Sequence, residues 1–432
     1  MRIAKSILVN PERNSVYGTT AVALSLFVFA YSSRFGQISI LAYYAMWLPL
    51  IFVDYHKVLG NYARYGWILA FAVFSFLSAF WSEAPAVSLR AAVQYFTHAI
   101  CALIAMRVLA TETLARGSVA GCTVVLLFSL AFGNYHYDPL DGTYSFVGAF
   151  SSKNQLGLYA SLGVLFSYMT ATVFRGRILW TVASLLSGML SAYALFASQS
   201  ATSIITTTAV LCVCIAMQIS LFLAPRNRQA LFVVGLVVIA CIGIAAVQLG
   251  AMDAVLGAFG KDTTLTGRTY LWQQGILEAG RAPWLGIGYY GFWVQGFPEA
   301  ERLWDDFFIV SRSGFHFHNT YIETMVETGI AGTFLISAIL LFCMGGHIRL
   351  FLRTGRSPQS LLLFAISALL FVRSFVEIDI MHPYHIGSFL LYFIAGKVLT
   401  RERDTVRPRT YHVFNSKNAA RWIREMRHVH SR

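Results

Sequence analysis

The stretch ALFVVGLVVIACIGIAAVQLG, residues 230–250, decides the fold class of this chain. It is apolar over a length that, as a helix, crosses a hydrocarbon core of about 30 Å. The composition of the whole chain agrees, because 57% of its 432 residues are hydrophobic and only 12% are charged. A chain this apolar has too few polar side chains to cover a soluble core of its size. The sequence therefore predicts an integral membrane protein.

Further apolar segments lie on both sides of this one. The complete set is 18–33, 36–53, 66–81, 91–110, 117–133, 155–174, 178–197, 203–224, 230–250, 325–346, 359–376 and 384–399. They predict an all-α, polytopic membrane protein of about 12 transmembrane helices, with one long loop between spans 9 and 10. The predicted parts are the first nine transmembrane helices in 1–250, the loop with short helices in 251–324, the last three transmembrane helices in 325–400 and a basic tail in 401–432.

The distribution of lysine and arginine orients these spans. With both termini in the cytoplasm, 24 of the 33 basic residues fall on the cytoplasmic side and 9 on the other. This bias is expected, because basic residues near span ends resist translocation. The long loop is therefore predicted to lie outside. The bias also accounts for the net charge of +13, so the partner that the charge indicates is the lipid bilayer, and no nucleic acid is predicted.

Two further features suggest no catalytic chemistry. In the basic tail, Trp422 and Ile423 suit a short amphipathic helix on anionic lipid, and a solvated tail fits the same residues equally well. All six cysteines lie within predicted spans. They therefore predict neither a disulfide framework nor a metal site.

The chain's longest polar interval runs from Met252 to Tyr321. Apolar residues after Arg268 recur at helical spacing, so Arg268 is predicted in the first turn of a helix that lies on the membrane. A guanidinium there can bind a diphosphate through two parallel hydrogen bonds. Cations retained beside a bilayer favour an anionic or phosphorylated ligand, and Arg281 is a second candidate contact for it.

The segment FHFHN, residues 315–319, precedes a helical pattern that continues into the tenth span. Asn319 and Glu323 lie four residues apart and share one face of that helix. His318 then sits at the helix start, where the dipole and burial lower its pKa and favour the neutral imidazole of a general base. A zinc pair with His316 is the competing reading, but their spacing suits a strand better and the sequence shows no third ligand.

Two shorter polar clusters border other outer turns. Lys153 and Asn154 stand where the sixth span begins, and the ammonium of Lys153 is predicted to meet an anion there or to be an ordinary interfacial lysine. Ser198 and Ser200 belong to a hydroxyl-rich turn that can bind sugar or phosphate oxygens, although helix capping explains it as well.

The last outer turn holds a third cluster, namely Arg373, Glu377, Asp379, His382 and His385. Arg373 and Glu377 lie four residues apart, so an ion pair within one helix is the first interpretation. The second is a contact with a ligand, directly or through a neighbouring side chain.

In their order along the chain, these motifs resemble the signature of the O-antigen ligase and polymerase superfamily, and most closely its exopolysaccharide polymerases of the succinoglycan type. The residues of the likeness are Ser151 to Gly157, Ser198 to Ser200, Lys261, Asp262, Thr266, Gly267, Arg268, Trp272, Pro283, Gly286, Gly288, His318, Asn319, Tyr321, Glu327, Gly329 and Gly332. The likeness covers about 145 to 385. One departure is Ala201, where relatives often have a basic residue, so a phosphate contact from that turn has no support here.

The resemblance implies a metal-independent, inverting glycosyltransferase of the bacterial inner membrane, with its site at the periplasmic face and no cofactor. The implied donor is an oligosaccharide repeat unit on undecaprenyl diphosphate and the implied acceptor a growing glycan, with chain-length regulators and export proteins as further partners. Arg268 would hold the diphosphate and His318 would take the proton of the acceptor hydroxyl. The residues assigned to substrate binding are Lys153, Asn154, Arg281, Asn319, Arg373, Ser198 and Ser200.

Two alternatives remain open at the level of the sequence. A ligase that moves the glycan to a lipid acceptor would use nearly the same residues. A non-enzymatic transporter of lipid-linked sugars also fits twelve spans and an outer polar site. Transporters usually bind near the bilayer midplane between internal repeats, whereas here the charged residues lie in loops and no repeat is visible.

Overall fold

The computed structural model describes residues 5–60, 62–138, 143–174, 178–248, 267–354 and 358–400. The end of the predicted ninth span, the loop up to Thr266 with Lys261 and Asp262, and the basic tail 401–432 lie outside the described residues. The helices and strands are α1 (Lys5–Leu8), α2 (Ser15–Trp47), α3 (Leu50–Val53), α4 (Tyr55–Leu59), η1 (Tyr62–Arg64), α5 (Ala70–Leu77), η2 (Ser78–Phe80), α6 (Pro85–Val108), α7 (Thr111–Phe132), β1 (Asn134–Asp138), β2 (Thr143–Gly148), α8 (Lys153–Thr172), α9 (Ile178–Ala197), α10 (Ala201–Ile219), η3 (Ser220–Phe222), α11 (Pro225–Gln248), α13 (Arg268–Ala279), α14 (Pro298–Asp306), α15 (Thr320–Thr354), α16 (Pro358–Arg373) and α17 (Ile386–Thr400).

Membrane-spanning helices dominate the part of the chain that the structure describes. Seven segments are long and apolar enough to cross a membrane, namely Ser15–Val53, Pro85–Val108, Thr111–Phe132, Ile178–Ala197, Ala201–Phe222, Pro225–Ala245 and Thr320–Arg353. Three shorter apolar helices, Ala70–Phe80, Gln359–Arg373 and Ile386–Thr400, stand at the predicted third, eleventh and twelfth spans. The helical, polytopic architecture is confirmed, and the count of twelve spans is not.

Helix α2 folds back on itself, which places two predicted spans in one continuous helical segment. The backbone leaves helical geometry at Tyr31 and Gly36. The Tyr17 hydroxyl donates a hydrogen bond to the Met46 carbonyl, although an unbroken helix of that length would separate the two residues by about 43 Å. Its two arms therefore run antiparallel and correspond to the predicted spans 18–33 and 36–53.

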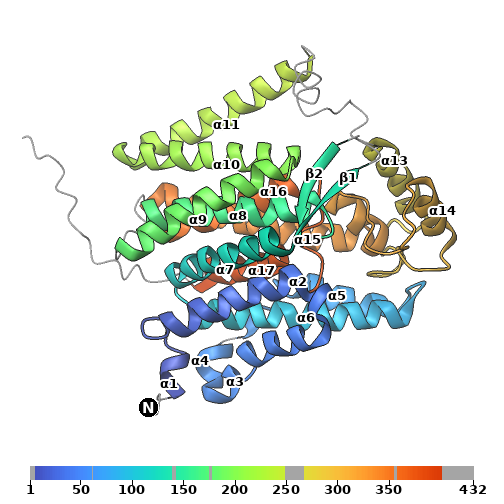
Figure 1. The fold of residues 1–432 in the computed structure, drawn as a ribbon, viewed down its shortest axis with the longest axis horizontal. Coiled ribbons are helices and arrows are strands. Elements are labelled where there is room, and N and C mark those ends of the chain that lie inside the picture. Colours follow the sequence, from blue (N-terminus) through green and yellow to red (C-terminus); the bar gives the residue numbers. More distant parts are fainter. Residues whose placement is uncertain are drawn as a thin grey trace, which may run out of the picture. The chain divides into compact units, whose positions relative to one another are not determined.

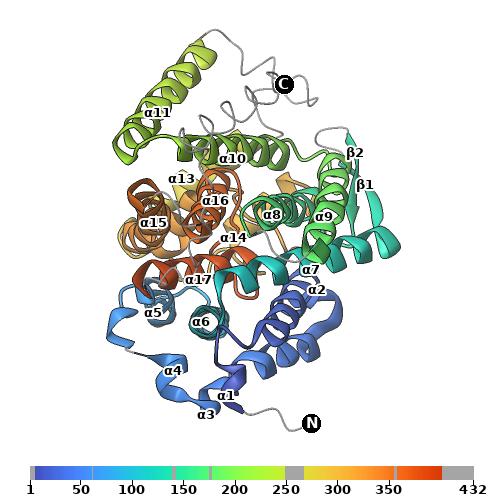
Figure 2. The same ribbon diagram turned by 90° about the vertical axis from the view of Figure 1, so that its left-hand side faces the viewer.

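Helix α8 lies inside the bundle, against α7, α9 and α10 (Figure 2). Glycines allow this close packing. A Cβ atom at Gly157 would lie 2.3 Å from the Ser203 hydroxyl oxygen of α10, and one at Gly163 would lie 2.2 Å from the Ser191 hydroxyl oxygen of α9. Small residues at such contacts let membrane helices approach one another, and here they bring the start of α8 beside the start of α10.

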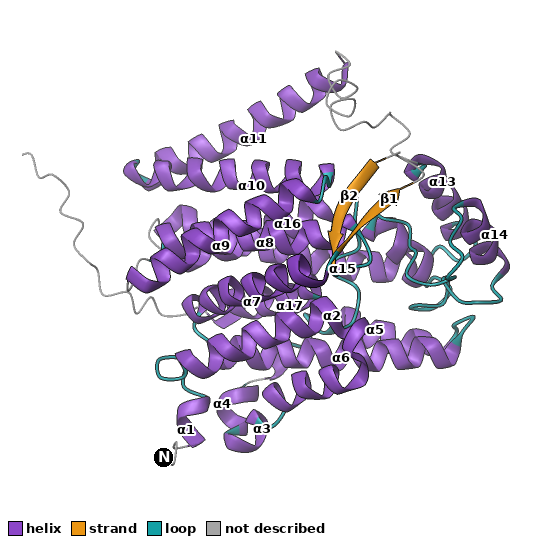
Figure 3. Cartoon of the chain, in the orientation of Figure 1, coloured by secondary structure: helices purple, strands orange, loops and turns teal. Residues whose placement is uncertain are grey.

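A two-stranded antiparallel hairpin departs from the all-α expectation. Strands β1 and β2 pair between α7 and α8, where the sequence predicted only an outer turn (Figure 3). Alternating aromatic residues in this stretch are the local signal for strands. The hairpin lies at the same end of the bundle as α13 and α14, whereas α1 lies at the opposite end (Figure 1).

The segment from α13 to the first turns of α15 forms a small unit with its own hydrophobic core. We call this segment the outer unit and its hydrophobic core the outer core. The members of that core are Leu271, Ala279, Phe292, Ala300, Leu303, Trp304, Phe307, Phe317 and Val326. Because aromatic side chains bury large areas, this core gives the outer loop a fixed shape. The short helices predicted for the loop are thus present as α13 and α14 in its described part.

Helix α15 is interrupted at Gly329, where φ is +62°. The break frees backbone groups that the segment after α13 then satisfies. The Ile330 N–H donates to the Pro283 carbonyl at 2.8 Å, and the Gly288 N–H donates to the Glu327 carbonyl at 2.9 Å. The outer unit is therefore hydrogen-bonded into a membrane helix, and the predicted turn at Gly286 and Gly288 is this contact.

Candidate active site

Arg268 is the first residue of α13, as the helical periodicity predicts. Gly267 precedes it with φ of +79°, in the left-handed region that favours glycine. The guanidinium reaches the turn after α16. Its Nη1 donates to the Val376 carbonyl at 2.8 Å and its Nη2 to Glu377 Oε1 at 3.0 Å. Arg268 thereby ties the outer loop to the last outer turn.

The peptide group of Phe317 is held on both sides, and this fixes the histidines next to it. The Phe317 N–H donates to Glu323 Oε2 at 2.7 Å, and Trp272 Nε1 donates to the Phe317 carbonyl at 2.8 Å. The Phe317 ring is fully buried in the outer core. His316 and His318 flank it with their ring centroids 4.1 Å apart.

His318 stands two residues ahead of α15, next to the capping residue at the predicted helix start. Asn319 caps α15, because its Oδ1 accepts hydrogen bonds from the Tyr321 and Ile322 N–H groups at 2.9 and 3.2 Å. His318 has φ of +52°, a conformation that costs a non-glycine residue about 1–3 kcal/mol. Its side chain is 24% exposed, so the imidazole is open to a substrate.

Glu377 is the carboxylate at the centre of the site. Its Oε1 accepts from Asn154 Nδ2 at 2.8 Å and from Arg268 Nη2 at 3.0 Å, and its Oε2 lies 3.6 Å from His318 Nδ1. Burial alone would raise the pKa of Glu377, but Arg268, His318 and Arg373 outweigh it and hold that pKa well below its ordinary value. The carboxylate is therefore ionised and joins three separate parts of the chain.

A line of hydrogen bonds leads from Glu377 into the bundle. Asn154 Oδ1 accepts from the Ser200 hydroxyl at 2.8 Å, and the Ser200 and Ser203 hydroxyl oxygens are 3.0 Å apart. Ser203 Oγ in turn accepts from Arg373 Nη1 at 2.9 Å. This polar network links the starts of α8 and α10 to the end of α16.

Arg373 is a buried structural cation. It is 1% exposed, and its Nε donates to Asp379 Oδ2 at 2.5 Å. The expected ion pair within the helix with Glu377 is therefore wrong, because the chain turns after Arg373 and brings Asp379 to the guanidinium instead. Through Ser203, Arg373 joins the network as a fully buried side chain.

Three other predicted residues differ in their proximity to Glu377. Lys153 is the first residue of α8, half-buried and next to Asn154. Ser198 is buried and accepts from the Ser200 N–H at 3.2 Å, whereas the capping role that the sequence allowed belongs to Ser200. Arg281 lies past the far end of α13, with its side chain 58% exposed and 3.0 Å from Glu278 Oε2. The structure does not bring Arg281 to the cluster.

Four helices begin at this cluster. Asn154 lies in the first turn of α8, Ser200 caps α10, Arg268 begins α13 and Asn319 caps α15. The hydrogen bonds above connect the first three through Glu377, and Asn319 Nδ2 donates to the Phe375 carbonyl of the same turn at 2.9 Å. Helix N-termini carry partial positive charge and present N–H groups, so their convergence favours an anion.

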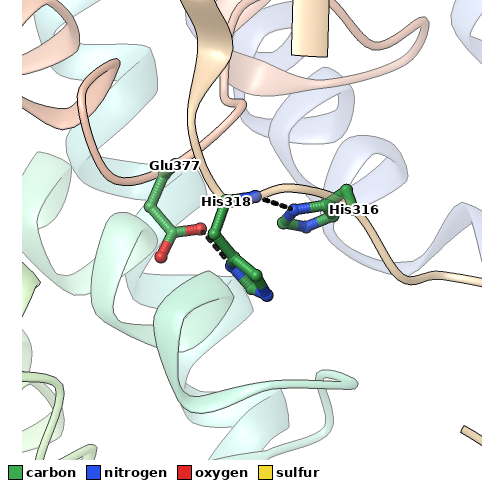
Figure 4. Close-up of side chains that lie close together, drawn as sticks. All are labelled: His316, His318 and Glu377. Atoms are coloured by element: carbon green, nitrogen blue, oxygen red, sulfur yellow. Dashed lines mark hydrogen bonds and ion pairs between the residues drawn. The ribbon is translucent and has the colours of Figure 1, made fainter. Parts of the chain in front are cut away.

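His316, His318 and Glu377 also lie close enough to be considered as metal ligands, with one candidate atom of each within 4.8 Å of the others (Figure 4). The prediction that His316 and His318 have no third metal ligand near them is therefore wrong. The electrostatics do not favour a cation here, however. The Arg268 guanidinium already lies 3.0 Å from Glu377 Oε1 and 3.4 Å from His318 Nδ1, where it would repel a metal ion.

A second pair of histidines, His382 and His385, lies in the last outer turn. The Tyr290 hydroxyl and His382 Nδ1 share a hydrogen bond, and His385 Nδ1 accepts from the Gly387 N–H at 3.2 Å. Burial lowers the pKa of His382 to about 3 and also lowers the pKa of His385. Both imidazoles are therefore neutral at physiological pH.

This chain is similar to known proteins over nearly its whole length. The family described as "O-Antigen ligase" matches residues 186–337, which include Ser198, Ser200, Arg268 and His318. The exopolysaccharide production protein ExoQ of Rhizobium meliloti (strain 1021) is 57% identical over 403 residues, which are 93% of this chain and 93% of that protein. An identity of this size over nearly the whole length of both chains means a common fold and family. This chain belongs to the O-antigen ligase and polymerase family of membrane proteins, as a relative of that exopolysaccharide production protein.

Proposed function

We propose that this protein is a polysaccharide polymerase of the bacterial inner membrane. It would join oligosaccharide repeat units linked to undecaprenyl diphosphate, by inverting and metal-independent glycosyl transfer at the periplasmic face. The observation that supports this most strongly is the convergence of four helix N-termini on Glu377, together with Arg268 and Lys153. Such a site favours a doubly phosphorylated leaving group.

The diphosphate of the donor requires stabilisation of developing negative charge. When the anomeric carbon loses its bond to the diphosphate oxygen, the electron pair leaves with the diphosphate. Arg268 offers that oxygen a planar, permanently charged donor. Lys153, in the first turn of α8, would provide a second cationic contact. No carboxylate nucleophile is needed, because the leaving group is already good.

His318 serves as the general base in this proposal. Its Nδ1 lies 3.4 Å from Arg268 Nη2 and 3.6 Å from Glu377 Oε2. When the donor diphosphate draws Arg268 toward itself, Nδ1–H can pair with the Glu377 carboxylate. The lone pair is then on Nε2, which takes the proton from the acceptor hydroxyl as its oxygen bonds to the anomeric carbon. Glu377 is a positioning residue that fixes the tautomer.

The nature of the acceptor separates a polymerase from a ligase. The relative's name refers to exopolysaccharide production, and that supports a growing glycan as the acceptor. A ligase would use the same Arg268 and His318 and would differ only in the molecule that offers the hydroxyl. In a strain without the protein, loss of long chains while single repeat units persist indicates a polymerase, and polymer that accumulates on the lipid carrier indicates a ligase.

The two substitutions His318→Ala and Arg268→Ala test the chemistry. Each is expected to reduce polymer formation by about 100-fold or more, because a general base or an electrostatic donor contributes at least that much to such a reaction. Polymer yield and length are measured by gel filtration, and the amount of protein in the membrane by immunoblot.

Matched controls separate this loss from general damage. His56→Ala removes an exposed histidine of α4, and Arg302→Ala removes a surface arginine that pairs with Asp306. Both are expected to leave polymer unchanged. Full-length polymer from the His318→Ala and Arg268→Ala proteins at normal membrane levels would contradict the proposed mechanism.

A further inference from the structure

The hairpin between α7 and α8 exposes an aromatic surface that the chemistry of the site does not use. Tyr135, Tyr137 and Tyr144 are 55%, 57% and 62% exposed. Tyr137 pairs directly with Tyr144 across the strands, and Tyr135 pairs with Phe146. Cross-strand partners point to the same side of a hairpin, so these residues share one face. We call Tyr135, Tyr137 and Tyr144 the tyrosine face.

Two of the three rings of this face are nearly parallel. Tyr135 and Tyr144 are stacked with their centroids 5.3 Å apart and an angle of 14° between the rings. Phe146, only 6% exposed, closes the base of the face against Tyr135, with ring centroids 5.2 Å apart. The stack therefore keeps its position without covering the outer ring surfaces.

The hairpin is attached firmly to the candidate active site. At its base the Ala149 N–H donates to the Ser129 hydroxyl at the end of α7, at 3.2 Å. Strand β2 ends at Gly148 and α8 begins at Lys153, so only residues 149–153 separate the hairpin from Asn154 and its contact with Glu377. Figure 1 shows β1 and β2 at the same end of the bundle as α13.

Sugar rings match such a surface. A pyranose has C–H groups on its faces and hydroxyls at its rim, and a tyrosine has an apolar ring face and a phenol hydroxyl. We propose that the tyrosine face binds the acceptor glycan next to the site of bond formation and holds the growing chain there between transfers. This inference rests on the proposed function, because it requires a glycan acceptor.

A membrane surface is the other occupant that tyrosines commonly meet, because they are enriched at lipid headgroups. The position of the hairpin favours the glycan. The chain runs from β2 directly into the first turn of α8, where Asn154 contacts Glu377, so a glycan on the tyrosine face is next to the site where the acceptor hydroxyl must be presented.

The test uses two double variants of the stacked pair. Tyr135→Leu with Tyr144→Leu keeps apolar bulk for hairpin packing and removes both aromatic faces. Tyr135→Phe with Tyr144→Phe keeps the rings. Tyr193→Ala, on a tyrosine of α9 that is 59% exposed, is the matched control for loss of an exposed ring elsewhere.

Binding is measured by calorimetry on the full-length protein in lipid nanodiscs. The probe is the repeat-unit oligosaccharide of the same strain, released from its lipid carrier by mild acid. The leucine double variant is expected to bind it about tenfold more weakly than the unaltered protein, and the phenylalanine variant and Tyr193→Ala within about threefold. Polymer made by the leucine variant is expected to be shorter than that made by the phenylalanine variant.

Each other outcome has a defined meaning. Unchanged affinity and unchanged polymer length in the leucine variant would overturn the inference. Unchanged affinity with a lower melting temperature in nanodiscs would overturn it in favour of a lipid contact. Full-length polymer from His318→Ala would instead contradict the proposed function, so the two failures are distinguishable.

Discussion

Glu377 illustrates how single residues organise this protein. Its carboxylate contacts Arg268, 109 positions earlier in the chain, and Asn154, 223 positions earlier. A buried carboxylate is costly unless its oxygens are paired, so Glu377 and its partners require one another. The residue that holds the site together is thus separate from the residues that would perform the reaction.

Substitution of Glu377 by glutamine tests this positioning role. The amide keeps the shape of the side chain and removes its charge, so His318 loses the carboxylate that selects its tautomer. We expect polymer synthesis to fall by about 100-fold or more, with the protein still inserted at a normal level. The informative readout is the pH profile, because a merely structural role would lower activity equally at all pH values. An unaltered rate would contradict the role assigned to Glu377.

Three half-buried histidines predict a contribution to stability that is lost in mild acid. Burial lowers the pKa of His316, His382 and His385 in the folded protein. Below their ordinary pKa of 6.5 the unfolded chain binds protons that the folded chain does not. The contribution of these histidines to folding stability should therefore fall as the pH drops below about 6.5, by at most about 1.4 kcal/mol per pH unit for each histidine.

Thermal melting of the purified protein between pH 8 and pH 5 measures this loss. Titration of Glu377 does not change the folding stability between pH 8 and pH 5, because the pKa of this residue is lowered in the folded protein. Its stabilising contribution is complete above the ordinary carboxyl pKa of 4.5 and declines only below it. The slope should be smaller in the His382→Gln protein than in the unaltered protein. Equal slopes in the two proteins would show that His382 is not held neutral in the folded protein.

Residues differed in how far their sequence context could predict their place. Arg268 was predicted at the start of a helix because the periodicity of its own neighbours fixes that position. The partners of Glu377 and Arg373 were not predictable in this way, since they come from distant segments that only tertiary packing brings together. Arg281 looked equivalent to Arg268 in the sequence, yet nearby carboxylates of the outer unit pair with it.

At the level of elements, the contact between α8 and α10 aligns the site. Gly157 lies one turn into α8, and any larger residue there would meet Ser203 and Ser200 of α10. Those two serines connect Asn154 with Arg373. Helix packing and the geometry of the polar network therefore depend on the same small residue.

The substitution Gly157→Ala tests this dependence. The added Cβ would lie 2.3 Å from Ser203 Oγ, so the helices must separate, at a cost of about 1–3 kcal/mol. We expect a lower melting temperature and slower polymer synthesis. Gly235→Ala in α11, where a Cβ meets nothing within 4 Å, is the matched control. Equal stability and activity of both variants would contradict the packing argument.

Two elements could not be predicted from hydropathy alone. The β1–β2 hairpin lies in a polar interval that is too short for a span, and apolar windows carry no signal for it. The sequence pattern did not predict the interruption of α15, because residues on both sides of Gly329 continue one apolar helical pattern. Only the hydrogen bonds from the segment at 283–288 make the break favourable. Local periodicity therefore identified the helices and missed the contacts between them.

For the molecule as a whole, the grouping of loops supports one outer face. The hairpin, α13 and α14 lie at one end, and the connection between α10 and α11 lies at the other (Figure 1). The sequence predicted the same division from its basic residues. Which end faces the periplasm remains a prediction of the charge bias.

Labelling of introduced cysteines tests that orientation. In a variant without the six native cysteines, Ser313→Cys places a thiol on the exposed loop after α14, and Ala224→Cys places one at the start of α11. An impermeant maleimide should label Ser313→Cys in intact spheroplasts and Ala224→Cys only after the inner membrane is opened. The reverse result would invert the predicted topology.

The interrupted helix also limits how this protein can be re-engineered. Chimeras that exchange only the outer loop between members of this family, to change their substrates, would cut the chain at the membrane boundary near residue 320. That cut separates the 283–288 segment from the backbone groups of α15 that it satisfies. Functional exchange units should instead extend through Ala331, so that donor and acceptor backbone groups come from the same parent.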